Sequence, residues 1–173
     1  MTVISANDVL VDLYMERAVD LLRLEAGTRD KVLVFLHEME TELVGKIAQI
    51  DPTGIGNVTR QRTRLQKLLD EVRSTIRGTY RDISTLMARE IREIIDQEAT
   101  WTGYAINTST QATFADASLT RSFLQNLVSE SFIRGASSEE WWSRQAGGLR
   151  DKFQDEMRRG VLLGESNSDL ITR

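Results

Sequence analysis

The chain has 173 residues, 22 of them basic and 26 acidic, which gives a formal net charge of −4. It has no cysteine, which excludes disulfides, thiolate metal sites and thiol catalysis, and no apolar run approaches the roughly 20 residues that span a bilayer. The acidic balance argues against a protein whose main task is to grip a nucleic-acid backbone, because phosphate neutralisation dominates that kind of binding.

The first predicted element is a helix over about residues 7–50, with Asn7 as its N-cap. Its apolar residues recur at three-four spacing. They are Leu10, Leu13, Tyr14, Ala18, Leu21, Leu24, Val32, Leu33, Leu36, Met39, Leu43, Ile47 and Ile50. Gly27 leaves two alternatives: two helices that meet there, or one long helix that tolerates a glycine at a cost of about 1 kcal/mol. We favour one helix, bent or straight, because no polar loop separates the two stretches.

A second long helix is expected over about residues 60–106. The stretch before it, DPTGIGNVT at 51–59, holds the chain's one proline and is its strongest break. The apolar side of the helix follows a repeat close to that of a coiled coil. It consists of Leu65, Leu69, Val72, Ile76, Tyr80, Ile83, Met87, Ile91, Ile94, Glu98, Trp101 and Ala105. A helix of about 45 residues is roughly 65–70 Å long, so we expect part of this stripe to stay uncovered within the chain.

The remaining residues predict shorter elements. We expect a loop over 107–118, a helix over about 119–132, and a turn before a last helix capped by Ser138 and closed by Gly164. Gly147 and Gly148 are a weak spot in that helix. SNSDLITR, at 166–173, is typical of a cap and the first turn of a further helix. The tail is either a short arm or the point at which a longer protein continues.

Together these elements predict an all-α, elongated fold. Residues 1–106 form a long antiparallel helical hairpin, and residues 107–173 form a smaller helical region leading to a C-terminus that is short or truncated.

The chain offers no set of residues typical of catalysis or of a cofactor. Its one histidine, His37, lacks the Glu-x-x-His spacing of di-iron bundles. The carboxylate pairs Glu38/Glu42, Glu90/Glu93 and Glu139/Glu140 are typical of ion-paired helix faces. GIGN, at 54–57, is followed by no Lys-Ser/Thr and is therefore not a phosphate loop. We predict no enzyme activity, no metal and no cofactor.

Four cations open the second long helix: Arg60, Arg62, Arg64 and Lys67. Cations at a helix start oppose the macrodipole, which an anionic partner would offset. The simpler interpretation is a solvated face whose acids Asp70 and Glu71 follow one turn later. The cluster is a candidate contact for an anionic partner, with DNA as a secondary possibility.

The candidate protein interface consists of large aromatic residues and two glycines: Trp101, Trp141, Trp142, Gly160 and Gly164. Trp141 and Trp142 are about 100° apart on a helix, so they cannot both face the same core. One of them could serve as an interface anchor, or the pair could form a broad buried face. Gly160 and Gly164 lie on one face and would admit another backbone, although a plain helix end explains Gly164 equally well.

The closing segment resembles the head morphogenesis family of tailed phages, the minor head proteins related to the F protein of phage Mu. Its signature is the run Arg158-Arg159-Gly160-Val161-Leu162-Leu163-Gly164-Glu165-Ser166 followed by Ile171, preceded by QAGGLRDKF at 145–153. Two further points are similar, the early step Tyr14-Met15-Glu16-Arg17 and the second helix ending at Trp101 to Ala105. The resemblance covers the architecture of nearly the whole chain, but only the last thirty residues carry specific motifs.

This resemblance implies a virion protein present in a few copies. It would associate with portal and inner capsid proteins in the phage head, be made in the host cytoplasm during assembly, and act in head assembly or genome delivery. Self-association is also expected, because the long apolar stripe is hard to cover. Two alternatives stay open: a helical adaptor or ejection protein that contacts DNA through Arg60 to Lys67, and the N-terminal helical part of a longer enzyme or toxin.

Overall fold

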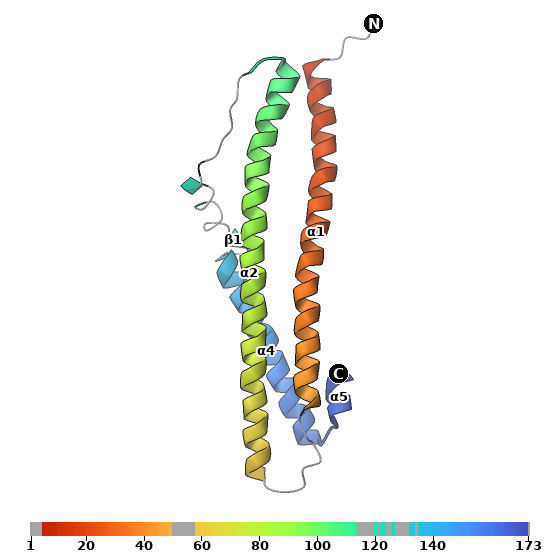
Figure 1. Ribbon diagram of the computed structural model, residues 1–173, viewed down its shortest axis with the longest axis vertical. Helices are drawn as coiled ribbons and strands as arrows, with labels where there is room; N and C mark the ends of the chain where they lie inside the picture. Colours follow the sequence, from red (N-terminus) through yellow and green to blue (C-terminus); the bar gives the residue numbers. More distant parts are fainter. Residues whose placement is uncertain are drawn as a thin grey trace. The chain divides into compact units, whose positions relative to one another are not determined.

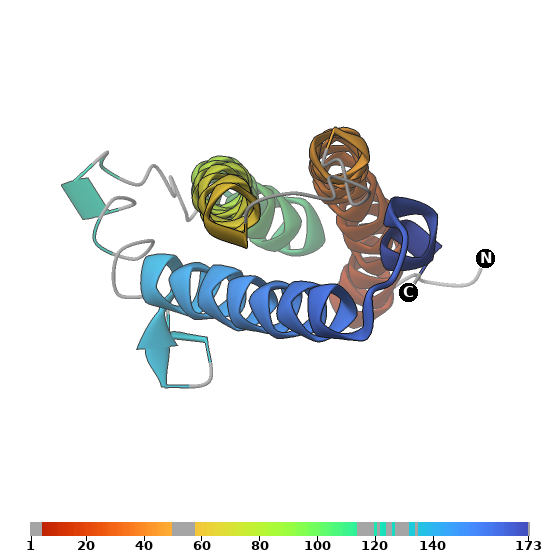
Figure 2. The same ribbon diagram turned by 90° about the horizontal axis from the view of Figure 1, so that it is seen from below.

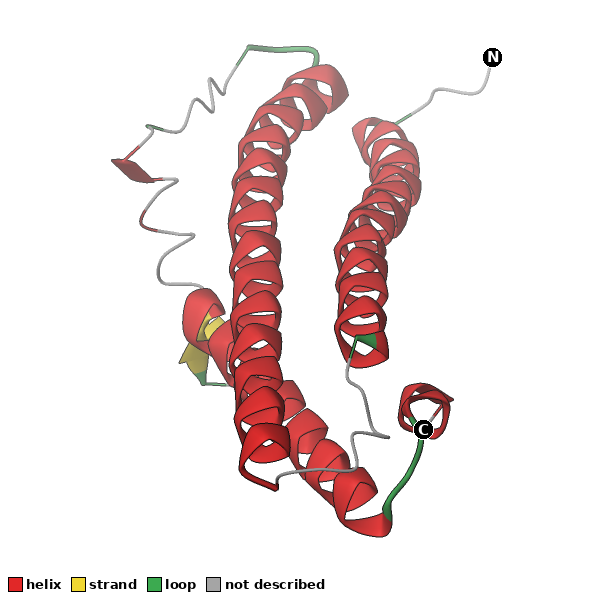
Figure 3. Ribbon diagram, turned by 60° about the horizontal axis from the view of Figure 1, so that its bottom comes forward, coloured by secondary structure: helices red, strands yellow, loops and turns green. Residues whose placement is uncertain are grey.

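The computed structural model describes residues 5–49, 58–113, 120, 122–123, 126, 132–133 and 135–172, without the side chains of 58–62 and 132–133. The helices in this part of the chain are α1 (Ala6–Ala48), α2 (Val58–Thr110), α4 (Ser138–Leu163) and α5 (Asn167–Thr172) (Figure 1). Two short strands, β1 (Phe132–Ile133) and β2 (Ala136–Ser137), pair with each other. Helix dominates the drawn elements (Figure 3), which confirms the all-α fold class.

Both long helices begin and end close to the predicted positions. α1 continues through Gly27, so the one-helix alternative is confirmed. α2 is longer than predicted, because the loop expected from residue 107 starts only after Thr110. In the last turn of α2 the hydroxyls of Ser109 and Thr110 donate to the carbonyl of Ile106, at 3.1 and 2.7 Å. Gln111, with φ of 53°, ends it in the left-handed region.

The ends of α4 and α5 follow local capping rules. The N-cap of α4 is Ser137, whose side chain accepts from the Glu140 N–H; the assignment of Ser138 as the cap was wrong by one residue. α4 passes through Gly147 and Gly148, and Gly164 closes it in the left-handed conformation with φ of 70°. At α5 the Ser166 hydroxyl donates to Asp169 Oδ2 at 2.6 Å, which lowers the carboxyl pKa and confirms the predicted cap. Most of the helix predicted over 119–132 lies outside the described residues.

The chain divides into two compact units, each of which takes segments from both long helices. Unit 1 is Met1–Lys31 with Thr85–Phe132, and unit 2 is Val32–Ser84 with Ile133–Arg173. The predicted boundary at residue 106 divides the chain along the sequence, whereas these units combine segments that are distant in sequence. That boundary therefore stays a prediction.

Unit 2 contains an apolar core. Its buried members are Met39, Leu43, Ile47, Leu68, Leu69, Val72, Ile76, Ala146 and Met157, with partly buried neighbours on α4 and α5. Thr75 on α2 donates to Glu42 on α1 at 2.8 Å and lowers the pKa of that carboxyl. α5 follows the end of α4 through a short turn (Figure 2). Three-four spacing on each helix thus builds one shared core.

Polar and aromatic contacts help to join the two helix segments of unit 1. The buried residues of α1 are Met39, Leu43 and Ile47, all of which belong to unit 2. Contacts within unit 1 link successively later residues of α1 to earlier residues of α2, from Tyr14–Trp101 to Lys31–Glu90. The two segments therefore run antiparallel in this unit. None of the described helices combines the length and hydropathy that a bilayer crossing requires.

The stripe on α2 is better covered than we predicted. Every apolar position of that stripe is buried or half-buried, and Val72, Ile76 and Ile83 have no exposed surface. The stripe is therefore largely covered, and half-buried positions such as Met87, Ile91 and Ile94 keep part of their surface in water. Large exposed apolar residues lie instead on α1 and at the end of α4, at Val161, Leu162 and Leu163.

Candidate functional site

The neighbouring tryptophans of α4 contact each other and α2 within unit 2. The rings of Trp141 and Trp142 meet edge to face with centroids 4.6 Å apart, and Trp142 lies 6.2 Å from the ring of Tyr80. Both tryptophans are half-buried. The Trp142 Nε1 atom is buried without a hydrogen-bond partner among the described residues. The pair therefore packs against its own chain, and its use as an interface stays a prediction.

Trp101 packs within unit 1. Its ring meets that of Tyr14 edge to face, with centroids 4.8 Å apart and planes at 76°. One turn along, Arg17 on α1 reaches Glu98 on α2, with Nε at 2.7 Å from Oε1. An aromatic pair of this kind contributes about 0.5–1.5 kcal/mol beyond the area it buries. Trp101 thus helps to hold α1 to α2.

The two glycines at the end of α4 have different roles. A Cβ on Gly160 would lie 2.1 Å from Leu170 Cδ2 and 2.8 Å from Glu165 Oε2. The close approach is therefore made by a side chain of α5, where we had predicted another backbone. Gly164 ends the helix with a positive φ, as the simpler alternative proposed.

The basic cluster is only partly described. Arg60 and Arg62 belong to the first turn of α2, but their side chains lie outside the described residues. Arg64 and Lys67 are exposed, and Lys67 Nζ lies 3.7 Å from Glu71 Oε1 one turn later. This ion pair matches the simpler interpretation of a solvated face.

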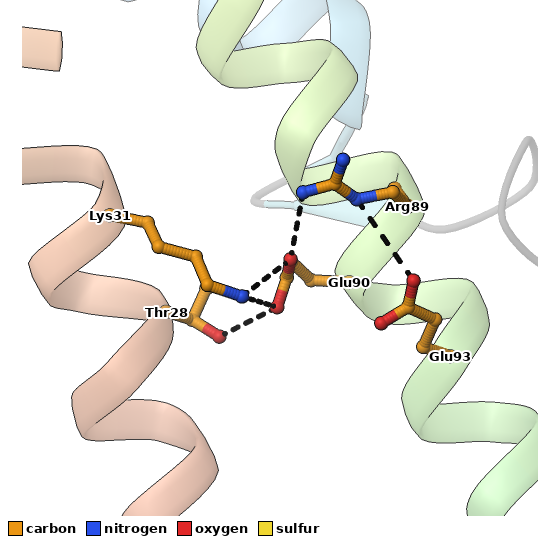
Figure 4. Close-up of polar contacts among 5 residues, drawn as sticks. All are labelled: Thr28, Lys31, Arg89, Glu90 and Glu93. Carbon is orange, nitrogen blue, oxygen red and sulfur yellow. Dashed lines mark hydrogen bonds and ion pairs between the residues drawn. The ribbon is translucent and has the colours of Figure 1, made fainter.

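The most buried charged group among the described residues is Glu90 on α2, with 3% of its surface exposed. Lys31 on α1 donates to its two carboxylate oxygens over 2.9 and 2.8 Å, and the Thr28 hydroxyl approaches Oε2 at 3.4 Å (Figure 4). Arg89 donates to Oε1 at 3.3 Å and also lies 4.0 Å from Glu93. One carboxylate therefore gathers donors from both helices of unit 1.

This arrangement stabilises a helix pair and is poorly suited to proton transfer. The hydrogen bond from Lys31 lowers the Glu90 pKa below its ordinary value and outweighs the effect of burial. A general acid at neutral pH needs the opposite shift. In the described part of the chain, no three His, Asp or Glu residues are grouped so that they could hold a metal ion. Glu90 thus links α1 to α2 through a buried carboxylate that accepts hydrogen bonds from Lys31.

A second apolar face of α1 is the feature that the spacing argument missed. Leu10, Leu13, Leu21 and Leu24 are half-buried on the side facing α2, as predicted, whereas Tyr14 and Ala18 are exposed. We define the outer face of α1 as Val11, Met15, Ala18, Val19, Leu22 and Ala26. At 100° per residue these six fall within a sector of about 100° on the side away from α2.

The outer face is mostly open to solvent. Met15 and Leu22 are 67% and 65% exposed, and Val11 and Val19 are 49% and 47% exposed. The residues of the outer face also recur at three-four spacing in the sequence. The neighbouring stripe of leucines has the clearer pattern, so the spacing predicts that stripe as the apolar face of the helix. A contiguous exposed apolar face is typical of a surface that binds another protein.

Comparisons with known proteins provide no relatives. No family model matches the chain, and neither a curated protein nor a solved structure is found to be similar to it.

Proposed function

We propose that this chain is a structural protein that acts by contact with other proteins, and that it works as a minor head protein of a tailed phage. The observation that carries the first part is the outer face of α1. It leaves large apolar side chains in water along a helix whose unit has little apolar core of its own. Covering such a face by a partner releases free energy at about 25 cal/mol per Å² of apolar surface.

The setting in a phage head is supported by the signature of the closing segment. Arg158 to Ser166 forms the end of α4, the Gly164 cap and the entry to α5. In this segment Gly160 admits Leu170 and Gly164 supplies the positive φ. The two glycines of the signature therefore shape the connection between α4 and α5. On this proposal the protein associates with portal and inner capsid proteins, in the virion and in the host cytoplasm during assembly.

The test is the composition of particles made by the phage whose genome encodes the chain. We expect quantitative mass spectrometry of purified heads to find the protein in a few copies, and deletion of its gene to reduce the yield of filled heads. A portal or terminase gene next to its own gene would agree with this expectation. Purified particles that lack the chain would refute the phage-head setting.

A further inference from the structure

We propose that a second copy of this chain docks on the outer face of α1 in antiparallel orientation. This deepens the proposed function and rests on its contact-based part. We infer a second copy as the partner because two copies of the outer face fit each other in shape and in charge.

The outer face has the spacing of a helix–helix seam. Val11, Met15, Ala18 and Leu22 follow one another by four, three and four residues, which is the a/d repeat of coiled coils. From Val11 to Ala26 the face extends about 22 Å along the helix. Two copies packed through it would cover the most exposed apolar side chains of α1 within unit 1.

The face is self-complementary when the two copies run antiparallel. With the two-fold axis between Ala18 and Val19, Met15 of one copy lies opposite Leu22 of the other. In the same register Val11 lies opposite Ala26, so each larger side chain at the ends meets a smaller one. Ala18 at the centre leaves room for the opposite helix to approach.

The charges beside the face favour the same orientation. Asp12 and Arg23 border it on one side, about 20° apart around the helix. In the antiparallel pair Asp12 of each copy lies near Arg23 of the other, so the contact forms twice. In a parallel pair the equivalent flanks lie on opposite sides of the seam, so Asp12 of one copy would not reach Arg23 of the other. Arg23 now lies 3.2 Å from Asp20 in an exposed ion pair, which a partner carboxylate can replace at little cost.

The ends of the face repeat this pattern. Asp8 and Arg29 flank the apolar residues at either end and lie opposite each other in the same register. Both carry exposed side chains in unit 1. Opposite charges therefore meet at the two ends of the antiparallel pair as well as beside its centre.

The first experiment measures the mass of the full chain by sedimentation velocity and light scattering across concentrations. We expect a dimer, and we expect Met15→Glu and Leu22→Glu to raise its dissociation constant at least about 100-fold, because each buries a carboxylate in an apolar contact. Tyr104→Glu is the matched control, since Tyr104 is a 56% exposed apolar residue of unit 1 outside the face. Circular dichroism checks that the variants keep their helix.

A charge exchange tests the orientation. Asp12→Arg and Arg23→Asp should each weaken the dimer roughly tenfold, because two attractive contacts become repulsive. The double variant D12R/R23D should recover most of the affinity. Failure of the double variant to recover would overturn the antiparallel arrangement.

Disulfide cross-linking tests the register. The chain has no natural cysteine, so an introduced cysteine can pair only with another introduced one. Ala18→Cys lies beside the two-fold axis and should form a disulfide between copies. Val11→Cys and Ala26→Cys should each fail alone and cross-link when the two variants are mixed. Efficient disulfides of Val11→Cys with itself would show a parallel pair and overturn the proposal.

Further outcomes would also overturn it. A chain that stays monomeric at all concentrations would refute the dimer. The same holds if the monomer binds lipid vesicles through the outer face. A dimer that Met15→Glu and Leu22→Glu leave intact uses another surface. If the dimer forms as proposed and phage heads lack the protein, the phage setting fails while this inference stands. If phage heads contain the protein and the chain is monomeric, the phage setting stands and the dimer inference fails.

Discussion

The ion pair between Lys31 and Glu90 allows a prediction about which partner matters more for stability. Glu90 is 3% exposed, whereas the Lys31 side chain is 50% exposed. Lys31→Met leaves a buried carboxylate with Arg89 as its remaining cation, at 3.3 Å. Glu90→Leu leaves an ammonium group that can turn into water, and puts an apolar side chain of similar size in the buried site.

The two substitutions should therefore differ in cost. Breaking a fully buried pair costs about 3–5 kcal/mol, and the residual contact with Arg89 reduces this, so we expect Lys31→Met to lower the free energy of unfolding by about 2 kcal/mol. Glu90→Leu should stay within about 1 kcal/mol of the natural protein, since well-packed apolar replacements of buried ions are often neutral. The double variant K31M/E90L should resemble Glu90→Leu.

The pH dependence has a definite sign. The Glu90 pKa is lowered in the folded protein, chiefly by Lys31. The stability from this pair is therefore fully present above the ordinary glutamate pKa of 4.5, and is lost as the pH falls towards the folded value. Lys31→Met removes the largest cause of the lowering, so the difference in stability between it and the natural protein should shrink below pH 4.5.

Urea unfolding at pH 7 and at pH 4 measures these effects. Trp101 lies in unit 1 and the other two tryptophans lie in unit 2. In a W141F/W142F background the fluorescence of Trp101 therefore reports on unit 1, and far-ultraviolet circular dichroism follows the whole chain. The matched control is Glu93→Leu, because Glu93 is 59% exposed and its pair with Arg89 is solvated; we expect a change within about 0.5 kcal/mol.

Equal costs for Glu90→Leu and Lys31→Met would refute the expected asymmetry. That result would mean that attraction within the pair, and not the burial of the carboxylate, dominates its contribution.

Three further predictions concern the other candidate residues. Gly160→Val should destabilise unit 2 by about 1–3 kcal/mol through overpacking against Leu170; urea unfolding measures it, and an unchanged midpoint would contradict the packing of α5. Trp142→Phe should be nearly neutral, because it removes a buried unpartnered N–H, whereas Trp142→Ala should cost about 1.5–3 kcal/mol, because the ring is half-buried; equal costs would contradict this account. The chain is acidic, so we expect any DNA binding at low salt to be weak and to use no particular cation cluster. Replacing the four cations of 60–67 by Gln should therefore lower the DNA affinity no more than replacing four cations of α4. A selective loss, with a flatter salt dependence, would favour the DNA-contacting alternative.

The sequence alone determined the features that depend on neighbours along the chain. Three-four spacing and the one proline predicted two long helices, and the all-α class followed. The caps at Gly164 and at Ser166 to Asp169 were predictable for the same reason, because a cap uses atoms within a few residues. Errors at the helix ends, at Thr110 and Ser137, amounted to a few residues because a local signal is ambiguous there.

Only the tertiary structure decided which face of each helix meets which partner. α1 carries two apolar faces, and spacing alone does not tell which of them packs on α2. The pairing of Glu90 with Lys31 joins residues 59 positions apart, a distance at which the sequence carries no local sign of contact. The same packing decided that Met15 and Leu22 stay in water while the stripe of α2 is covered. The physical reason is that burial depends on how helices from distant parts of the chain come together, whereas helix formation depends on the residues within a few turns.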